Sequence, residues 1–176
     1  MLRSMESPAQ LTELAAKHAS DIVRLALKHD GARRALVVFD SRSPLSRLVT
    51  EAYRRALPNA PHLDFDALSK ENVMAAIDAL APDDLIVLIQ STNFRLDDFR
   101  IRIELFKRSL RVIEHVHLER ADDERQIGIY VGAMAYDPAY YLPRGRALKE
   151  TIDRAGRIQV FCKDAVLTYE GGMDEA

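Results

Sequence analysis

Two short runs of purely apolar residues constrain the fold of this chain more than any other feature. Residues 35–39 read ALVVF, and residues 85–89 read LIVLI. A continuous apolar run is expected in a strand that is covered on both faces, whereas a half-exposed strand alternates. Segments of helical periodicity separate these runs, as in βαβ units. The sequence therefore predicts an α/β fold: a mostly parallel sheet with helices on both faces, a three-layer sandwich.

Helix-start signals support this order of elements. Ser7-Pro8 and Ser43-Pro44 each place a good N-cap before a proline at the first helical position, and Ser69 is a third N-cap candidate. Gly31 suits the end of the first helix. The expected helices are 8–28, 44–57, 70–80, 97–109, 123–135 and 138–155, and the remaining strands are 62–68, 111–119, 158–161 and 165–169.

Composition narrows the class of protein. The 176 residues predict a single α/β domain over 1–176, with an ordered core over 7–170. A net charge of −2 argues against nucleic-acid and membrane binding, which need a concentrated positive field. Cys162 is the one cysteine and cannot form an internal disulfide, so nothing points to secretion. We expect a cytoplasmic protein.

The last two predicted strands offer a first binding mode. Ile158–Phe161 and Ala165–Tyr169 are joined at Lys163-Asp164, which predicts a C-terminal β-hairpin. A terminal hairpin leaves unpaired backbone groups unless a partner covers them, so an extended peptide can add to it. The expected peptide-binding residues here are Ile158, Val160, Val166, Leu167 and Tyr169.

Polar loops that follow two strands offer a second binding mode. Asp40–Ser43 follows the first apolar run, and Ser91–Arg95 follows the second. Ligands of open α/β sheets lie beyond such strand ends, and arginine forks suit carboxylates. Arg42, Asn93 and Arg95 are therefore candidates to hold a peptide. The competing interpretation is that these residues only cap the following helices.

Catalytic and metal sites are not expected. His115 and His117 stand two apart on a predicted strand and would share a face, but a catalytic zinc needs a third protein ligand. Cys162 has no catalytic histidine motif beside it, and no G-x-S-x-G elbow is present. Neither polar loop is glycine-rich, which argues against phosphate binding. No cofactor is therefore expected.

Four tyrosines gather in the sequence around the last two predicted helices: Tyr130, Tyr136, Tyr140 and Tyr141. Such a group can form an aromatic wall or a dimer face. It can equally reflect helices that pack on the sheet.

Several segments together resemble a known family. They are Arg111–Arg120 (RVIEHVHLER), Ala135–Tyr141 (AYDPAYY), Ala147–Ala155 (ALKETIDRA) and Ser91–Leu96 (STNFRL). From about residue 35 to 169 the chain resembles the amino-terminal domain of thermophilic-type leucyl aminopeptidases, the aminopeptidase T family. In that family the metal ligands lie in the carboxyl-terminal domain. This chain ends with GGMDEA about where that domain would begin, so the resemblance transfers no catalytic residue to it.

The resemblance implies a domain that helps to enclose a peptide and contributes to dimer contacts. The chain is also similar to small peptide-binding accessory proteins of ribosomal-peptide natural-product pathways, of the crocagin type. We therefore expect a non-catalytic homodimer that binds a precursor peptide or a flexible segment of a partner enzyme, and brings it near a modifying enzyme. The alternatives are a metal-dependent hydrolase or aminopeptidase-like enzyme or fragment using His115 and His117, and a purely structural dimerisation module.

Overall fold

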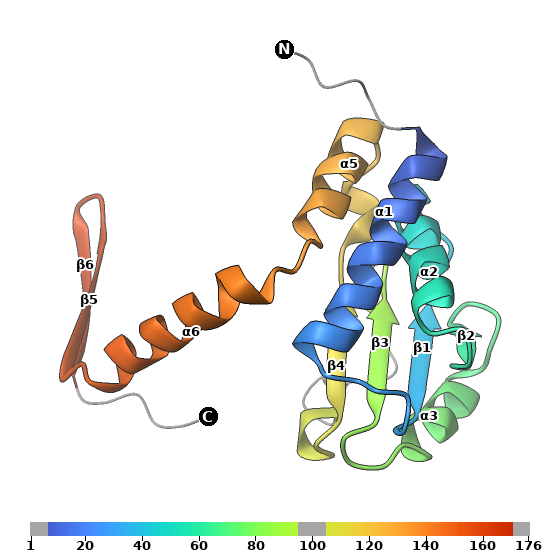
Figure 1. Cartoon of the computed structure of the whole chain (residues 1–176), viewed down its shortest axis with the longest axis horizontal. Helices are drawn as coiled ribbons and strands as arrows, with labels where there is room; N and C mark the ends of the chain where they lie inside the picture. The colour runs from blue at the N-terminus through green and yellow to red at the C-terminus, as the bar shows by residue number, and fades with distance from the viewer. Residues whose placement is uncertain (1–6, 95–104, 171–176) are drawn as a thin grey trace. The chain divides into compact units, whose positions relative to one another are not determined.

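The computed structural model describes residues 7–94 and 105–170, and the chain divides into two compact units after Tyr136. The first unit is shown in blue to orange-yellow in Figure 1 and the second in orange to red. The first unit contains α1 (Pro8–Asp21), the π-helical turn η1 (Ile22–Ala26), β1 (Ala35–Phe39), α2 (Pro44–Ala56), β2 (His62–Asp64), α3 (Lys70–Asp78), β3 (Leu85–Ile89), β4 (Arg111–His115), the 3₁₀ turn η2 (Leu118–Arg120) and α5 (Glu124–Ala133). The second contains α6 (Pro138–Asp153), β5 (Arg157–Cys162) and β6 (Ala165–Glu170).

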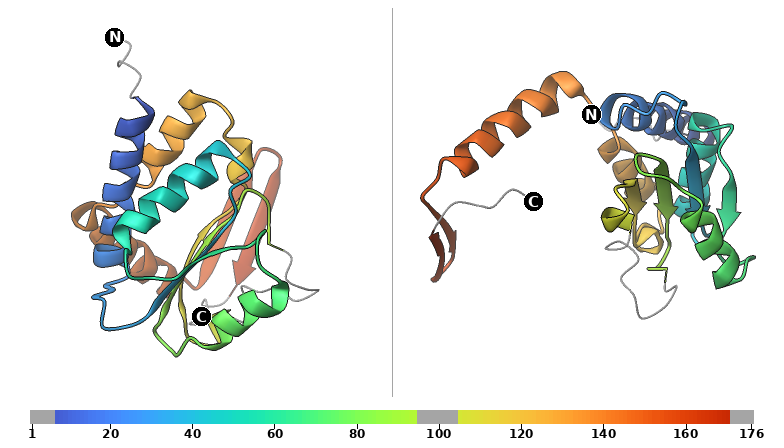
Figure 2. Two further views of the ribbon diagram at one scale, coloured as in Figure 1. Left: turned by 90° about the vertical axis from the view of Figure 1, so that its right-hand side faces the viewer. Right: turned by 90° about the horizontal axis from the view of Figure 1, so that it is seen from below.

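The first unit is built on a four-stranded parallel sheet in the order β2-β1-β3-β4. Val37 of β1 is in register with Val87 of β3, which is in register with Ile113 of β4. Helices α1, α2 and α5 lie on one face of this sheet and α3 on the other, as Figures 1 and 2 show. The fold class expected from the two apolar runs is therefore confirmed: an α/β sheet flanked by helices, with a C-terminal antiparallel hairpin.

The two faces of β1 and β3 bury separate hydrophobic clusters. Odd-numbered residues, among them Val37, Val87 and Ile89, pack with residues of α1, α2 and α5. Even-numbered residues, among them Ile86 and Leu88, pack with Val73 and Ile77 of α3. All five side chains of β3 are at most 1% exposed. Continuous apolar runs arise here because both faces of the strand need an apolar residue.

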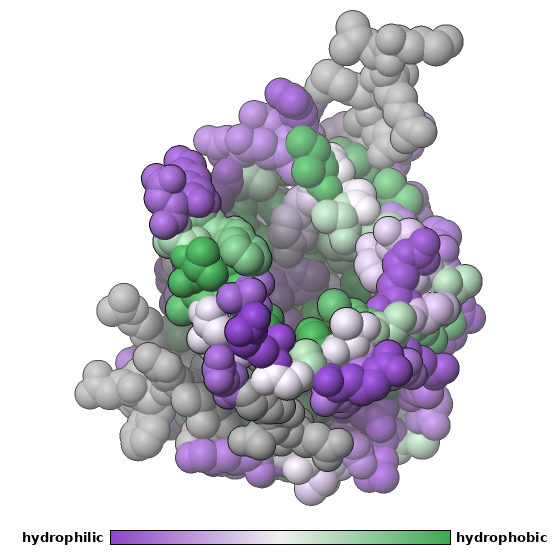
Figure 3. Space-filling model, turned by 90° about the vertical axis from the view of Figure 1, so that its left-hand side faces the viewer, coloured by the Kyte–Doolittle hydropathy of each residue, from purple (hydrophilic) through white to green (hydrophobic). Residues whose placement is uncertain are grey.

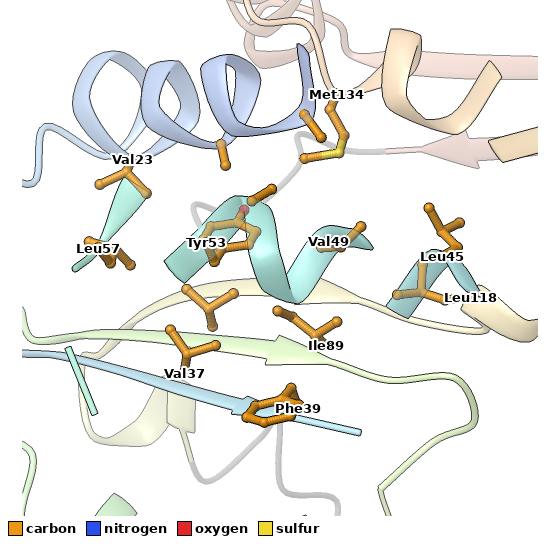
Figure 4. Packing of buried hydrophobic residues seen from close by; sticks show 14 of the residues in the cluster. Val23, Val37, Phe39, Leu45, Val49, Tyr53, Leu57, Ile89, Leu118 and Met134 are labelled. Atoms are coloured by element: carbon orange, nitrogen blue, oxygen red, sulfur yellow. The ribbon is translucent and has the colours of Figure 1, made fainter. Parts of the chain in front are cut away.

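Helix α2 forms the centre of the larger cluster. Its side chains Val49 and Tyr53 are fully buried and lie between α1 and the strands, as Figure 4 shows. Ser43 caps the helix by accepting a hydrogen bond from the Ser46 amide at 3.0 Å, and Pro44 occupies the first turn. The cap predicted from the Ser-Pro pair is thus confirmed.

Two strands end earlier than their sequence suggests, each for a local reason. β2 stops at Asp64, whose carboxylate accepts the Asp66 amide at 2.9 Å and turns the chain. β4 stops at His115, because His117 adopts a left-handed φ of 58° and the Leu118 amide donates to the Gln90 carbonyl at 3.1 Å. The strands predicted over 62–68 and 111–119 are therefore wrong in their second halves. Most of the helix predicted over 97–109 lies outside the described residues.

The second unit consists of α6 and the hairpin, and none of its described residues is buried. Asp137 caps α6 by accepting the Ala139 amide at 2.9 Å. β5 and β6 pair antiparallel from Arg157↔Glu170 to Cys162↔Ala165, and Lys163 begins the turn with a left-handed φ of 49°. The predicted hairpin is confirmed, with each strand slightly longer than expected.

Within residues 7–94 and 105–170, no helix has both the length and the apolar character needed to cross a bilayer.

We predict that truncation of the central strand destabilises the first unit strongly. Ile86 is fully buried in β3, so Ile86→Ala should lower the free energy of unfolding by about 2–5 kcal/mol through lost burial and the cavity left behind. Ile129 of α5 is 63% exposed, and Ile129→Ala should change it by less than about 0.5 kcal/mol. Urea unfolding measures both values, and equal losses in the two variants would contradict this packing.

Candidate functional site

The polar loops at the carboxyl ends of β1 and β3 meet, as the topology requires. Asp40 follows β1 and is 1% exposed; its carboxylate accepts the Ser91 amide at 2.7 Å and the Ser91 hydroxyl at 2.5 Å. The Ser43 amide in turn donates to the Ser91 Oγ at 3.1 Å. Asp40 and Ser91 therefore tie the two strand ends together and support the cap of α2. The Ser91 proton is directed to a carboxylate, which is not the serine–histidine pairing of a nucleophile.

Arg42 is already engaged by a carboxylate of this chain. Its guanidinium binds Asp66 with two nitrogens: Nε donates to Oδ2 at 2.8 Å and Nη2 to Oδ1. The hydrogen bond to Asp66 also raises the pKa of Arg42. The pair is exposed, with 54% of the Arg42 side chain and 36% of the Asp66 side chain accessible, so solvent screens its strength. A peptide carboxylate at this position would have to displace Asp66.

The other strand-end candidates are not assembled around Arg42. Asn93 is exposed, and Arg95 lies outside the described residues. Between them, Phe94 is held in place: its amide donates to Gln90 Oε1 at 2.7 Å, and its ring stacks on Phe65 at 4.2 Å. The described part of this loop is thus fastened to the sheet, and Asn93 projects from it.

A buried histidine lies between two tyrosines behind this edge. His115 ends β4 and is 7% exposed. Its Nε2 is 3.0 Å from the Tyr53 hydroxyl of α2, and its Nδ1 is 2.7 Å from the Tyr130 hydroxyl of α5. A neutral imidazole has one donor and one acceptor, so one tyrosine donates and the other accepts. The three side chains connect the sheet to two helices through the larger core cluster.

Burial fixes the protonation state of this group. Desolvation lowers the pKa of His115 to about 4, because the charged imidazolium loses its hydration in the core. Desolvation likewise raises the pKa of Tyr130 to about 12, and it raises the pKa of Tyr53 further. His115 is therefore neutral near pH 7, with both ring nitrogens occupied by tyrosines.

The two histidines expected to share a strand face are separated by the end of β4. His117 stands in the left-handed turn beyond the strand, at the position just before η2, and its side chain makes no capping hydrogen bond. No group of three or more histidine, cysteine, aspartate or glutamate side chains suited to a metal ion occurs in the described residues. Cys162 is exposed at the end of β5.

The hairpin brings together most of the residues expected to bind a peptide. The cross-strand pairs Ile158↔Tyr169, Val160↔Leu167 and Cys162↔Ala165 share one face, which is apolar throughout. Val166 pairs with Phe161 on the opposite face, beside the polar pair Gln159↔Thr168. Sequence reasoning identified most of the apolar residues of the hairpin, but it left out Phe161 and did not separate the two faces.

Sequence reasoning missed the partner of Arg42 and the two partners of His115. Asp66 follows β2, so it lies at the carboxyl ends of the strands, as Arg42 does. The rule that residues after parallel strands meet at this edge therefore predicts the position of both residues. Tyr53 and Tyr130 lie on different helices, and no local pattern connects them to His115. Tyr130 packs against the larger core cluster, whereas Tyr140 and Tyr141 belong to the second unit, where each is 50% exposed.

No family model, curated protein or solved structure matches this chain.

We predict that His115 makes the stability of the first unit depend on pH. Its folded pKa of about 4 lies below the ordinary 6.5, so the unfolded chain binds the proton more readily. Stability should therefore fall as pH falls from about 6.5 to about 4, by about 3 kcal/mol from this group. The contribution is fully present above pH 6.5.

The measurement is the unfolding free energy between pH 7 and pH 4 for the wild type and His115→Phe. The variant should lose less stability over this range, because it lacks the titration of His115. The other histidines and the carboxylates titrate in both proteins and account for the loss that remains. Parallel pH curves would contradict a neutral buried His115, as would an imidazole NMR signal of His115 that titrates near pH 6.5.

Proposed function

We propose that this protein binds a peptide without cleaving it, through the hairpin of its second unit. The observation that carries the proposal is the apolar face formed by Ile158, Val160, Cys162, Ala165, Leu167 and Tyr169, which we call the hairpin face. Val160, Leu167 and Tyr169 are 48%, 54% and 50% exposed. Figure 3 shows hydrophobic side chains, in green, at the surface among hydrophilic ones. Exposed apolar surface of this extent indicates a binding partner. The reverse face has one apolar pair, Phe161 and Val166, which are 72% and 55% exposed, and its other pairs are polar.

The backbone of the hairpin offers the complementary half of a peptide site. Its sheet has only the strands β5 and β6 among the described residues, so each strand has an outer edge with peptide groups available for pairing. An extended peptide that adds to such an edge gains main-chain hydrogen bonds. Every second side chain of that peptide would then continue the hairpin face, which supplies selectivity for alternating apolar residues.

The strand-end mode is the weaker of the two expected from the sequence. Arg42, its principal charged group, is already paired with Asp66, and Asn93 projects from a loop that is fastened elsewhere. The hairpin needs no such displacement before a peptide binds. We therefore place peptide binding on the hairpin face.

The proposed ligand is a precursor peptide or a flexible segment of a partner enzyme in ribosomal-peptide natural-product biosynthesis. The resemblance to peptide-binding accessory proteins of such pathways supports this choice, and the geometry of the hairpin suits an extended segment. Binding would act by recruitment, because holding a peptide beside a modifying enzyme raises its effective concentration there.

We predict that peptide binding depends on the hairpin face and not on its reverse. A displayed library of random short peptides should yield binders to the full chain that alternate apolar and polar residues. Leu167→Glu places a charge on the hairpin face and should weaken these binders at least about tenfold, because a buried unpaired charge is costly. Thr168→Glu, one residue along on the reverse face, should leave affinity nearly unchanged. Calorimetry measures both.

Circular dichroism and thermal unfolding first establish that both variants fold as the wild type does. Peptides that bind Leu167→Glu as tightly as Thr168→Glu would contradict the proposal. So would a library that yields no peptide enriched over an unrelated control protein.

A second candidate function, dimerisation, is favoured by helix α6. Tyr141, Gly145, Leu148 and Ile152 recur at helical spacing and define one stripe of this helix. Leu148 is 62% exposed, and a Cβ built on Gly145 would meet nothing within 4 Å, so another helix can approach closely there. We propose that two copies of the chain pack along this stripe.

We predict that Leu148→Glu shifts the protein from dimer to monomer, because two copies would bury two unpaired charges at the contact. Arg146→Glu, on the other side of α6, should leave the dimer intact. Sedimentation equilibrium measures the mass of each. A monomeric wild type, or a Leu148→Glu variant that remains dimeric, would contradict a dimer built on α6.

A further inference from the structure

We propose that the first unit has a binding pocket for a small amphipathic monocarboxylate, an apolar chain with one anionic head, at the amino ends of its strands. The hollow measures about 1050 Å³ and lies among the η1–β1 connection, the α2–β2 connection and the end of α3. This volume is on the order of the 300–1,000 Å³ typical of small-molecule sites. It lies at the opposite end of β1 from Asp40, so it is independent of the strand-end loops.

The wall of the pocket is apolar. Its side chains come from helices on both faces of the sheet and from β1 and β2. The pocket therefore borders both core clusters. Hydrocarbon placed there would be removed from water, and burial of each CH₂ group favours binding. The apolar lining comprises Val23, Leu36, Ala56, Leu57, Leu63, Ala76, Ala79 and Leu80.

The rim of the pocket is basic. Arg24, Lys28, Arg33 and Arg34 line it, against one acidic residue, Asp30. Aspartates outside the lining lie close to three of these cations, so the positive charge left for a ligand is concentrated at Lys28. A cation beside a low-dielectric wall attracts a ligand head of the opposite sign. The rim thus specifies the charge of the ligand, as the wall specifies its tail.

Part of this charge is free to meet a ligand. Arg34 is paired with Asp84 at 3.0 Å, and Arg24 with Asp21 at 3.5 Å. Arg33 makes a longer ion pair with Asp83, at 3.9 Å. Lys28, by contrast, makes no ion pair with any residue that the structure describes. We therefore assign the anion mainly to Lys28, with Arg33 as the second contact. A carboxylate at the rim would form exposed, charge-assisted hydrogen bonds.

Two unusual backbone conformations lie in the lining of the pocket. The π-helical turn η1 ends the first helix and supplies Val23 and Arg24, and such turns occur frequently at functional sites. Gly31 has a φ of 81°, which favours glycine, and an added Cβ there would meet nothing within 4 Å.

The test is calorimetric titration of the full chain with octanoate, 1-octanol and octylamine, which share a tail and differ in head charge. Octanoate should bind at least about fivefold more tightly than 1-octanol, and octylamine should bind most weakly. The double substitution Lys28→Gln/Arg33→Gln should remove this preference for octanoate and leave 1-octanol unchanged. Both side chains are on the surface, so the fold should be retained.

Two further variants locate the binding site. Ala79→Leu adds bulk to the lining at an exposed position and should weaken both octanoate and 1-octanol about fivefold or more. The matched control is Lys163→Gln, which should bind octanoate as the wild type does. Lys163 lies in the hairpin turn and has a left-handed φ of 49°, close to the 53° of Lys28.

Octanoate that fails to bind would overturn the proposal. So would equal affinity for octanoate in the wild type, Lys28→Gln/Arg33→Gln and Ala79→Leu, since the ligand would then lie elsewhere, for example on the hairpin face. Peptide binding at the hairpin is measured in a separate experiment. The outcome of the octanoate titrations therefore neither supports nor contradicts the proposal for the hairpin.

Discussion

Complete burial of β3 on both faces is the constraint on which the first unit depends. A strand in this position needs apolar residues at every site, a paired strand on each side and a helix layer on each face. β1 and β4 supply the pairing, and α2 and α3 supply the layers. Because the strands are parallel, their carboxyl ends meet at one edge and their amino ends at the other. The polar and charged groups of the first unit that the preceding sections describe therefore lie at one or the other of these two edges.

The two edges of the sheet differ in how far their groups are already satisfied. At the carboxyl edge Asp40, Ser91 and Ser43 bond to one another, and Arg42 binds Asp66. These interactions brace the strand ends and already occupy the polar groups that take part in them. At the amino edge an apolar hollow is bordered by Lys28, which has no ion pair within the described residues. The edge that most α/β sheets use for ligands is braced here by hydrogen bonds within the chain.

The sequence predicted most of the secondary structure because its signals are local. Apolar runs and Ser-Pro caps located β1, β3 and α2, since each depends on neighbouring residues alone. The early end of β4 was missed because it depends on the left-handed turn at His117 and on a hydrogen bond to Gln90 in another strand. The Tyr53–His115–Tyr130 network and the amino-edge pocket were missed for the same reason. Both are made by side chains that come together only through the tertiary fold.

One feature of the second unit has a practical chemical meaning. Cys162 is the single thiol of the chain, and it lies exposed at the end of β5, next to the turn of the hairpin. Maleimide and iodoacetamide reagents would therefore modify the protein at one place, giving a homogeneous conjugate. A fluorophore or spin label attached there would report directly on events at the hairpin. Storage in air without a reducing agent would instead join chains covalently at this sulfur.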